Sequence, residues 1–272
     1  MKKLSITTIA LLIGFFLFQE TTVSPVVKIQ AQTAAETAQQ ATQKLLGVAS
    51  APSLTASAVL AQRPPAALLE APAVRQLPEL YNGCEVSSLA MLLAAAGHSV
   101  DKMELSDRLV KDPTPYIGKS LQQIQQWGDP NLGFVGDITG KKKGYGVYNG
   151  PLFDLLVTYV SEGAENLTGK NFDTLEWVLS QGHPIVVWTT VSFQPTDRWV
   201  TWKNNDQEIR ATFQMHAVLL VGYDDQHVYI NDPLTGSKGQ KLNKSAFIKS
   251  WEQLGKQAIT IMEEHPHWYV LR

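Results

Sequence analysis

The pattern of hydrophobic residues changes once along this chain of 272 residues, near Pro184, and that change constrains the fold more than any other feature. Before it, apolar residues recur at the three- and four-residue spacing of amphipathic helices. After it, they gather in short runs rich in valine, isoleucine and threonine, which favour β-strands. Because helices precede strands and do not alternate with them, the sequence predicts an α+β fold with an antiparallel sheet.

Four helices are predicted before this change. The first follows Cys84 and ends before Gly97, a residue type that commonly stands just after a helix end. Its apolar residues cover more than one face, so we expect this helix to be buried nearly all round. The stretch 128–150 contains seven glycines and is predicted to be a long ordered loop. The four helices are predicted over residues 85–96, 102–110, 151–162 and 172–181.

The later predicted elements are mostly strands. Two of them flank Asp224-Asp225, a pair of turn-forming residues, and this arrangement predicts a β-hairpin. A fifth helix, over 244–254, is predicted between Asn243, which suits the N-cap position, and Gly255. The strands are predicted over residues 185–191, 216–223, 227–231 and 257–262.

The amino end has the features of an export signal. Lys2 and Lys3 precede an uncharged stretch from Leu4 to Phe18. As a helix this stretch spans roughly 22 Å, which is short of the roughly 30 Å of a bilayer core. A positive start followed by a short apolar segment is typical of a secretory signal. We therefore predict a signal peptide over 1–31 and an exported protein, with an uncleaved amino-terminal anchor as the alternative.

The segment 32–74 is rich in alanine, glutamine, threonine, serine and proline and shows no sustained hydrophobic period. Such low complexity is typical of a pro-segment, a stalk or a linker. From residue 75 onward, aromatic residues, glycines and β-branched runs appear. The remaining 75–272, about 200 residues, suffices for one domain with a substantial core.

The composition excludes several classes of protein. Lysine and arginine total 23 and aspartate and glutamate total 25, and this net charge of −2 argues against a nucleic-acid-binding protein. The glycine-rich stretches match neither a phosphate-binding nor a dinucleotide-binding loop. A single cysteine excludes an intrachain disulfide framework and a zinc site built from several cysteines. We therefore expect no nucleic-acid partner, no cofactor and no metal.

Cys84 is the first candidate for chemistry. It stands at the start of the predicted buried helix, where unpaired N–H groups and a partial positive charge favour a thiolate over a thiol. The same N–H groups are suited to receive an oxyanion. The alternative is an inert, buried cysteine, which is the ordinary role of a lone cysteine.

A thiolate nucleophile needs a base, and His216 is the best placed of the six histidines, because it begins the most apolar predicted strand. One register of the hairpin pairs Tyr223 with His227. On that register Asp232 is a diagonal neighbour of His216 on the same face, where it would orient the imidazole. A two-residue turn would place Asp232 on the opposite face. The alternative role of Asp232-Pro233 is that of a strand-ending turn.

Several stretches of the sequence resemble one known family. They are QLPELYNGCEVSSLAMLL, GHPIVVWTT, HAVLLVGYDD and VYINDPLTG. They are similar to the secreted branch of the bacteriocin-leader-peptidase-like cysteine peptidases, peptidase family thirty-nine of the papain-like superfamily. The resemblance runs from about Gln76 to Ile261. It implies a papain-like α+β fold, in which an amino-terminal helical part with the nucleophile helix packs on a carboxy-terminal antiparallel sheet.

The resemblance also implies the roles of particular residues. Its motifs place the nucleophile at Cys84, the base at His216 and the orienting acid at Asp232. They place an oxyanion-hole amide at Gln76, for which the alternative is a polar loop residue. Leader peptidases of this group are usually fused to peptide transporters, and we expect neither spanning helices beyond the amino end nor a nucleotide site here. Cleavage of leader peptides inside a cell is therefore not implied.

The expected function is that of an exported cysteine peptidase or amidase of Gram-positive bacteria, which needs no cofactor. Its partner would be a peptide or a cell-envelope substrate. It would be secreted or associated with the cell surface, and would touch a membrane only through an uncleaved anchor. Two alternatives stay open, a catalytically silent surface module that binds such polymers, and an acyl transferase. The sequence leaves the oligomeric state open.

Overall fold

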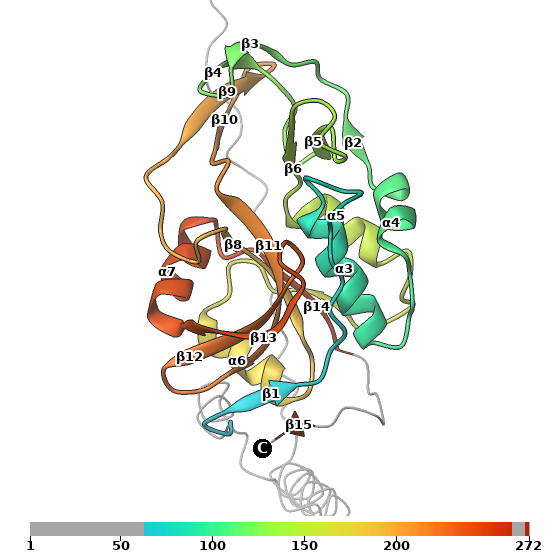
Figure 1. Ribbon diagram of the computed structural model, residues 1–272, viewed down its shortest axis with the longest axis vertical. Helices are drawn as coiled ribbons and strands as arrows, with labels where there is room; N and C mark the ends of the chain where they lie inside the picture. Colours follow the sequence, from blue (N-terminus) through green and yellow to red (C-terminus); the bar gives the residue numbers. More distant parts are fainter. Residues whose placement is uncertain (1–62, 263–269, 272) are drawn as a thin grey trace, which may run out of the picture. The chain divides into compact units, whose positions relative to one another are not determined.

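The computed structural model describes residues 63–262 and 270–271, and Figure 1 shows their arrangement. The predicted signal segment over 1–31 and the first part of the predicted linker lie outside the described residues. Among the helices that the structure does describe, none is long and apolar enough to cross a membrane.

Five helices are present in the described residues, and four of them confirm the predicted helices with small shifts at their ends. The fifth, α5, begins and ends earlier than predicted. Its last turn tightens because the Leu155 carbonyl accepts bonds from both the N–H and the hydroxyl of Thr158, at 3.1 and 2.8 Å. The helices are α3 (Cys84–Ala95), α4 (Lys102–Arg108), α5 (Asn149–Leu156), α6 (Phe172–Ser180) and α7 (Lys244–Gln253).

The main sheet has eight strands in the described part of the chain. Six run in the order β13-β12-β11-β8-β14-β7, while β1 pairs with β11 and β15 pairs with β1. All of these pairings are antiparallel, as predicted. The strands are β1 (Ala67–Leu69), β7 (Ala164–Asn166), β8 (Ile185–Thr190), β11 (Met215–Tyr223), β12 (His227–Asp232), β13 (Ser237–Asn243), β14 (Ala258–Ile261) and β15 (Val270–Leu271).

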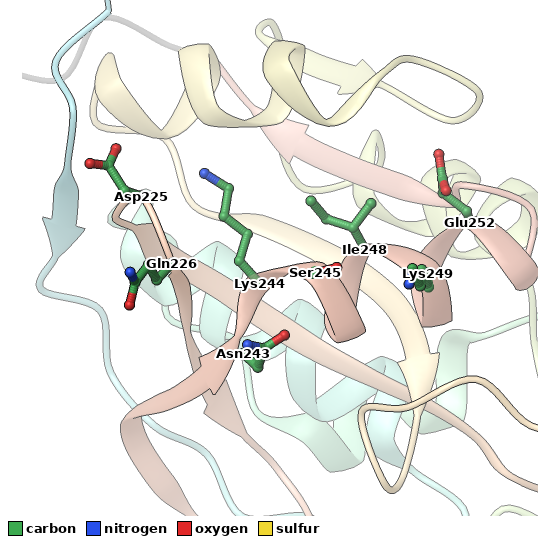
Figure 2. Close-up of a pocket in the computed structure, with 8 residues that line it drawn as sticks. All are labelled: Asp225, Gln226, Asn243, Lys244, Ser245, Ile248, Lys249 and Glu252. Atoms are coloured by element: carbon green, nitrogen blue, oxygen red, sulfur yellow. The ribbon is translucent and has the colours of Figure 1, made fainter.

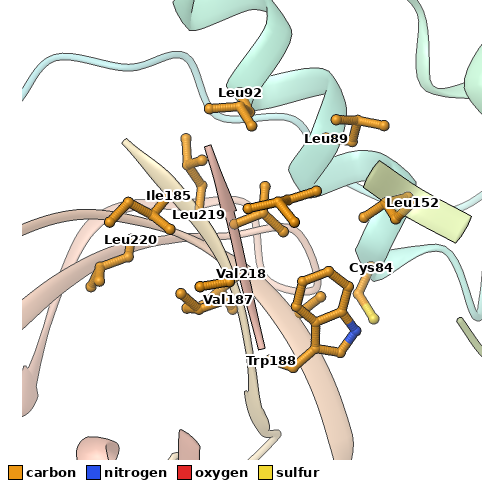
Figure 3. Close-up of a cluster of buried hydrophobic side chains, with 14 of the residues drawn as sticks. Cys84, Leu89, Leu92, Leu152, Ile185, Val187, Trp188, Val218, Leu219 and Leu220 are labelled. Atoms are coloured by element: carbon orange, nitrogen blue, oxygen red, sulfur yellow. The ribbon is translucent and has the colours of Figure 1, made fainter. Parts of the chain in front are cut away.

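The core lies between α3 and the centre of this sheet. Figure 3 shows Leu89 and Leu92 of α3 above side chains of β8 and β11. Every residue of α3 from Cys84 to Leu93 is buried, which confirms the prediction of a helix buried nearly all round. The Ser88 hydroxyl donates to the Ala217 carbonyl at 3.1 Å and joins the helix to β11. The helix that carries the cysteine is therefore fixed to the strand that carries His216.

The opposite face of β8 is covered by α7, which Figure 1 shows on the other side of the sheet from α3. The Ser250 hydroxyl of α7 bonds the Thr189 hydroxyl at 2.9 Å and accepts from the Thr190 N–H at 3.0 Å. The central strands are consequently buried on both faces, which explains why their sequences read as uninterrupted apolar runs.

Two small sheets were not predicted, since their strands are only two to five residues long. One has the order β10-β9-β4-β3, and the other has the order β2-β5-β6 and includes part of the predicted ordered loop. The Asp112 carboxylate joins the two by accepting from the Asp129 N–H at 3.0 Å and the Asn204 amide at 3.1 Å. The strands are β2 (Lys111–Asp112), β3 (Ile117–Ser120), β4 (Gln123–Gln126), β5 (Phe134–Gly136), β6 (Gly144–Gly146), β9 (Val200–Asn204) and β10 (Gln207–Ala211).

Residues 63–74, which composition assigned to the linker, are part of this fold. Strand β1 pairs with the end of β11 at Gly222, where a Cβ would lie 2.4 Å from the Ala67 carbonyl oxygen. The Tyr223 hydroxyl donates to the Pro64 carbonyl at 2.7 Å. Low-complexity composition did not reveal this segment, because main-chain pairing holds it and only a glycine on the partner strand permits so close an approach.

Candidate active site

Cys84 is the first residue of α3 and follows a tight turn. At the N-cap position, a Cβ on Gly83 would lie 2.4 Å from the Leu80 Cβ, so only glycine fits there without displacing Leu80. The Gly83 N–H donates to the Leu80 carbonyl, and the Leu80 N–H donates to the Gln76 carbonyl, both at 3.1 Å. Because the first N–H groups of a helix have no acceptor within it, this turn leaves donors beside the thiol.

The Cys84 side chain is 8% exposed, and Figure 3 shows it beside Trp188. Burial raises the pKa of the Cys84 thiol well above its ordinary value, and the charge of the Glu85 carboxylate raises it further. A main-chain hydrogen bond from Ala217, the residue after His216, acts in the opposite direction. Burial and a neighbouring negative charge thus outweigh the helix N-terminus in this resting state, although the Cys84 main-chain N–H acts to lower the pKa of the thiol.

Glu85 is a residue of the site that the sequence reasoning missed. It is 1% exposed, its Oε1 accepts from the Val147 N–H at 2.9 Å, and its Oε2 accepts from the Cys84 Sγ at 3.3 Å. Burial raises the pKa of Glu85 to about 7, although hydrogen bonds from the Val147 N–H and the Cys84 thiol act to lower it. The signal in the sequence is an acidic residue in the first turn of a helix predicted to be buried nearly all round.

His216 and Asp232 form a buried pair on neighbouring strands. Each is 3% exposed, and the His216 Nε2 lies 2.7 Å from the Asp232 Oδ1. Burial acts to raise the pKa of Asp232, but the hydrogen bond and charge of His216 outweigh it, together with bonds from the Leu234 N–H and the Thr235 hydroxyl. The pKa of Asp232 is consequently below its ordinary value, and the Nδ1 side of the imidazole is left for another partner.

The hairpin brings these two side chains to one face by a route that differs from the prediction. Tyr223 pairs with Val228 and not with His227, so the turn contains four residues. An even number of turn residues would, by itself, put Asp232 on the face opposite His216, because strand side chains alternate. The predicted pairing at the turn is therefore wrong.

A β-bulge on β11 restores the predicted face. The register shifts by one residue between Leu220 and Gly222, and beyond the shift Leu219 pairs with Asn231. Continued by one residue, this register sets Asp232 diagonal to the histidine on the same face. The 2.7 Å hydrogen bond between the two confirms that placement.

Gln76 lies between the turn before α3 and the end of β12. Its main-chain N–H donates to the Pro233 carbonyl at 2.8 Å, and the residue is 3% exposed. Its Nε2 donates to the carbonyls of Leu80 at 3.3 Å and Tyr81 at 2.8 Å. Within the described residues its Oε1 is buried and has no hydrogen-bond partner. The amide is thus at the site, while its role as an oxyanion-hole donor stays a prediction.

Two aromatic features lie at the end of β11 that carries His216. The Phe193 ring centroid is 6.3 Å from that of the imidazole, and no sequence pattern pointed to this loop residue. A pocket of about 210 Å³ is lined by Met215, which precedes His216 in β11, together with Tyr145, Trp199 and Arg210. The Arg210 guanidinium lies 3.8 Å from the centre of the Trp199 ring. This pocket has the size of one side chain and offers aromatic walls and one cation.

A larger pocket of about 590 Å³ lies between the β11–β12 turn and the start of α7, and Figure 2 shows the side chains that line it. It contains none of the predicted site residues. Within the part of the chain that the structure describes, no group of three or more histidine, cysteine, aspartate or glutamate residues is arranged to hold a metal ion.

Comparison with known proteins agrees with the fold. Residues 68–259 match the model of a family described as Peptidase_C39 like family. The chain is 42% identical over 186 residues to the uncharacterized protein YvpB of Bacillus subtilis. The aligned residues cover 68% of this chain and 71% of that protein. A crystal structure of a protein described as a C39-like peptidase from Bacillus anthracis is 40% identical, covers 73% of this chain and 98% of that chain, and superposes with a TM-score of 0.65.

The helical part, which includes the helix that begins at Cys84, and the antiparallel sheet form the α+β, papain-like fold that the sequence predicts. The matched residues include Cys84, His216 and Asp232 and extend over more than half of the chain. The protein therefore belongs to the Peptidase_C39 like family.

Proposed function

We propose that this protein is an exported cysteine peptidase that hydrolyses peptide or amide bonds through Cys84, His216 and Asp232. One observation carries the proposal. A buried histidine whose Nε2 is 2.7 Å from a carboxylate lies on the strand that is bonded directly to the start of the cysteine helix. A carboxylate that fixes one imidazole nitrogen leaves the other free to take a proton from a nucleophile.

The reaction begins with proton transfer. The Cys84 Sγ proton passes to the His216 Nδ1, and Asp232 stabilises the imidazolium because its pKa lies below the ordinary value and keeps it charged. Sγ then attacks the carbonyl carbon. The N–H groups at the start of α3 hold the oxyanion, and Gln76 adds a donor once its amide N–H faces the reacting oxygen.

Collapse of the tetrahedral adduct breaks the carbon–nitrogen bond, and His216 gives its proton to the leaving amine. Water then adds to the thioester, with its proton taken by His216, and release of the acid returns Sγ to the thiol. The aromatic-lined pocket at Met215, whose lining includes none of the three proposed catalytic residues, has a size that suits a substrate side chain. No step requires a cofactor.

The proposed partner is a peptide or a peptide of the cell envelope, and the proposed location is outside the cell or on its surface. These two proposals rest on the sequence of residues 1–31. An acyl transferase uses the same acyl-enzyme but passes the acyl group to an amine. A silent binding module keeps the fold without thiol chemistry.

Inactivation by iodoacetamide, measured against pH for the wild type and for His216→Ala, tests the proposal. We expect alkylation of the wild type well below pH 8.5, the value near which a free cysteine titrates, and loss of this reactivity in the variant. Ordinary thiol behaviour in both proteins would leave only the binding module. Product analysis with a peptide library, with and without an added amine, then separates hydrolysis from acyl transfer.

A further inference from the structure

Glu85 is a buried carboxyl in contact with the nucleophile, and the proposed mechanism does not use it. Its two oxygens are both occupied, since Oε1 accepts from the Val147 N–H and Oε2 accepts from the Cys84 Sγ. Its side chain is 1% exposed, so water does not compete for either oxygen. The carboxyl is therefore held in one orientation, with one oxygen aimed at the thiol.

The approach of Gly146 shows how closely this carboxyl is enclosed. A Cβ at Gly146 would lie 2.3 Å from Glu85 Oε1 and 2.5 Å from the Met215 Cε, and the Gly146 φ of 148° is one that other residues rarely adopt. Gly146 therefore brings its main chain, without a side chain, against the Glu85 carboxyl. The Met215 side chain packs against the same position.

We propose that Glu85 is a further catalytic residue, which keeps Cys84 in its thiol form when it is charged and stabilises the thiolate when it is protonated. A charged carboxylate can only accept, so it holds the S–H proton and repels a thiolate. A neutral carboxyl has a proton to donate, and an O–H donated to a thiolate is a charge-assisted hydrogen bond. This inference rests on the proposed function, because it concerns the same thiol.

The groups that face Glu85 allow this change of state. From α3 the neighbour is the Cys84 thiol, and from the loop before α5 it is the Val147 N–H. The Tyr145 hydroxyl, which bonds Tyr148 and Met215, also feels the charge of Glu85. None of the ion pairs within the described residues includes Glu85, so no cation holds it in the charged form. Burial accordingly raises the pKa of Glu85 to about 7.

The proton balance of the activation step is simple. The resting state holds a charged Glu85, a Cys84 thiol and a neutral His216. One proton enters from solvent and binds the Glu85 Oε2, while the Sγ proton moves to the His216 Nδ1. The active state therefore holds a neutral carboxyl, a thiolate and an imidazolium, and it contains one proton more than the resting state. Lower pH consequently favours the thiolate at this site, which is the reverse of an isolated cysteine.

The test is the iodoacetamide alkylation rate of the full chain between pH 6 and pH 8. In the wild type we expect the rate to fall by about tenfold over this range, because a group that titrates near pH 7 loses most of its proton there. In Glu85→Gln the side chain is neutral at every pH, and we expect this fall to disappear. Glu176→Gln is the matched control, because Glu176 is also 1% exposed but pairs with Lys244 and Arg63, away from the thiol.

The outcomes separate this inference from the proposed function. If Glu85→Gln retains the fall, Glu85 is not the titrating group and the inference is overturned, even if His216→Ala abolishes the reactivity. If the wild type and His216→Ala behave alike as ordinary thiols, the proposed function fails first. A fall that disappears in Glu85→Gln and remains in Glu176→Gln supports the inference.

A second measurement applies if Glu85→Gln does not fold. Infrared difference spectra of the wild type between pH 6 and pH 8 report the protonated carboxyl C=O stretch, and Cys84→Ala leaves Glu85 in place while it removes the thiol. We expect a carboxyl that titrates near pH 7 in the wild type and at a higher pH in Cys84→Ala, because the thiol hydrogen bond that lowers the pKa of Glu85 is lost. Absence of any carboxyl that titrates in this range overturns the inference.

Discussion

The two sides of the site contain two buried carboxyls that behave in opposite ways. On the sheet side Asp232 is 3% exposed, and on the helix side Glu85 is 1% exposed. The pKa of Asp232 is lowered and that of Glu85 is raised to about 7. Burial acts on both in the same direction, so the difference lies in their partners. His216, the Leu234 N–H and the Thr235 hydroxyl all bond to Asp232, whereas only a thiol and one N–H group bond to Glu85.

This comparison shows how one fold can lower the pKa of one buried carboxyl and raise that of another. A third buried carboxylate, Glu176, confirms what an anion needs, because it pairs with both Lys244 and Arg63. Removing Asp232 from one side of the site and removing Glu85 from the other should therefore have distinct effects. The predictions below follow from that contrast, in order of decreasing effect.

The largest effect is expected for Asp232→Ala. Without the carboxylate, the His216 Nε2 loses its acceptor at 2.7 Å, and the imidazole is neither oriented nor stabilised when it takes the proton. We expect kcat to fall by about 10²–10⁴-fold, with KM little changed. The measurement is steady-state peptide hydrolysis. Equal kcat values in the wild type and the variant would show that the pair is only structural.

The next effect is on the pH dependence of stability. The raised pKa of Glu85 means that the folded state binds a proton more tightly than the unfolded chain does, so stability falls as pH rises from about 4.5 to about 7. We compare the free energy of unfolding of Glu85→Gln with that of the wild type at each pH. The variant's advantage should be larger at pH 8 than at pH 5 by roughly 3 kcal/mol. Urea unfolding at the two pH values measures it.

Asp232→Asn should change the pH dependence of stability in the opposite direction, measured in the same experiment. The lowered pKa of Asp232 contributes stability above the unfolded pKa, and this contribution is lost as pH falls through the folded value. The free energy of unfolding of the wild type should therefore exceed that of this variant most at pH 7, and this difference should shrink below pH 4. Parallel pH profiles for the wild type and both variants would contradict the contrast between the two carboxyls.

A smaller effect is expected for Gly146→Ala. The added Cβ meets Glu85 Oε1 at 2.3 Å, and the φ of 148° strains an alanine. We expect a loss of about 1–3 kcal/mol in the free energy of unfolding, measured in urea, together with a changed pH profile of alkylation because Glu85 is displaced. Gly169→Ala is the control, since it also has a positive φ but nothing lies within 4 Å of its Cβ position. It should lose stability and leave alkylation unchanged.

The smallest effect is expected for Trp188→Phe. The indole Nε1 donates to the Val147 carbonyl at 2.9 Å, and Val147 in turn donates to Glu85. Phenylalanine keeps most of the apolar contact but removes the donor, so we expect a loss of about 1–2 kcal/mol from one buried, unsatisfied carbonyl. Urea unfolding gives the value. An unchanged stability would mean that the carbonyl finds another donor.

Much of the central fold could be predicted because its elements repeat a simple period. Helix α3 and strands β8 and β11 contain apolar residues at nearly every position, and their burial on both sides preserves that signal. The strands β9 and β10 were not predicted, because each is only five residues long, although buried and exposed positions alternate along both; a side-chain bond to a distant segment helps to hold them. Their order depends on tertiary contacts that no local pattern carries.

In the site, one feature was predicted correctly and another was missed. His216 and Asp232 were predicted to share a face, yet the face depends on a bulge between Leu220 and Gly222 that compensates for a longer turn. Bulges follow from packing on both faces of the sheet, so sequence alternation alone does not locate them. Glu85 was missed because a helix pattern identifies which positions are buried but says nothing about the partners that a buried carboxyl finds.

The pairing of β1 with the far end of β11 has a mechanical consequence. His216 and Gly222 are six residues apart on that strand, which corresponds to roughly 20 Å. Strand β1 pairs with β11 at the Gly222 end. Any attachment that pulls on the chain upstream of residue 63 therefore loads the sheet at the end remote from the thiol. The β1–β11 pairing, and not the segment around His216, would take that load first.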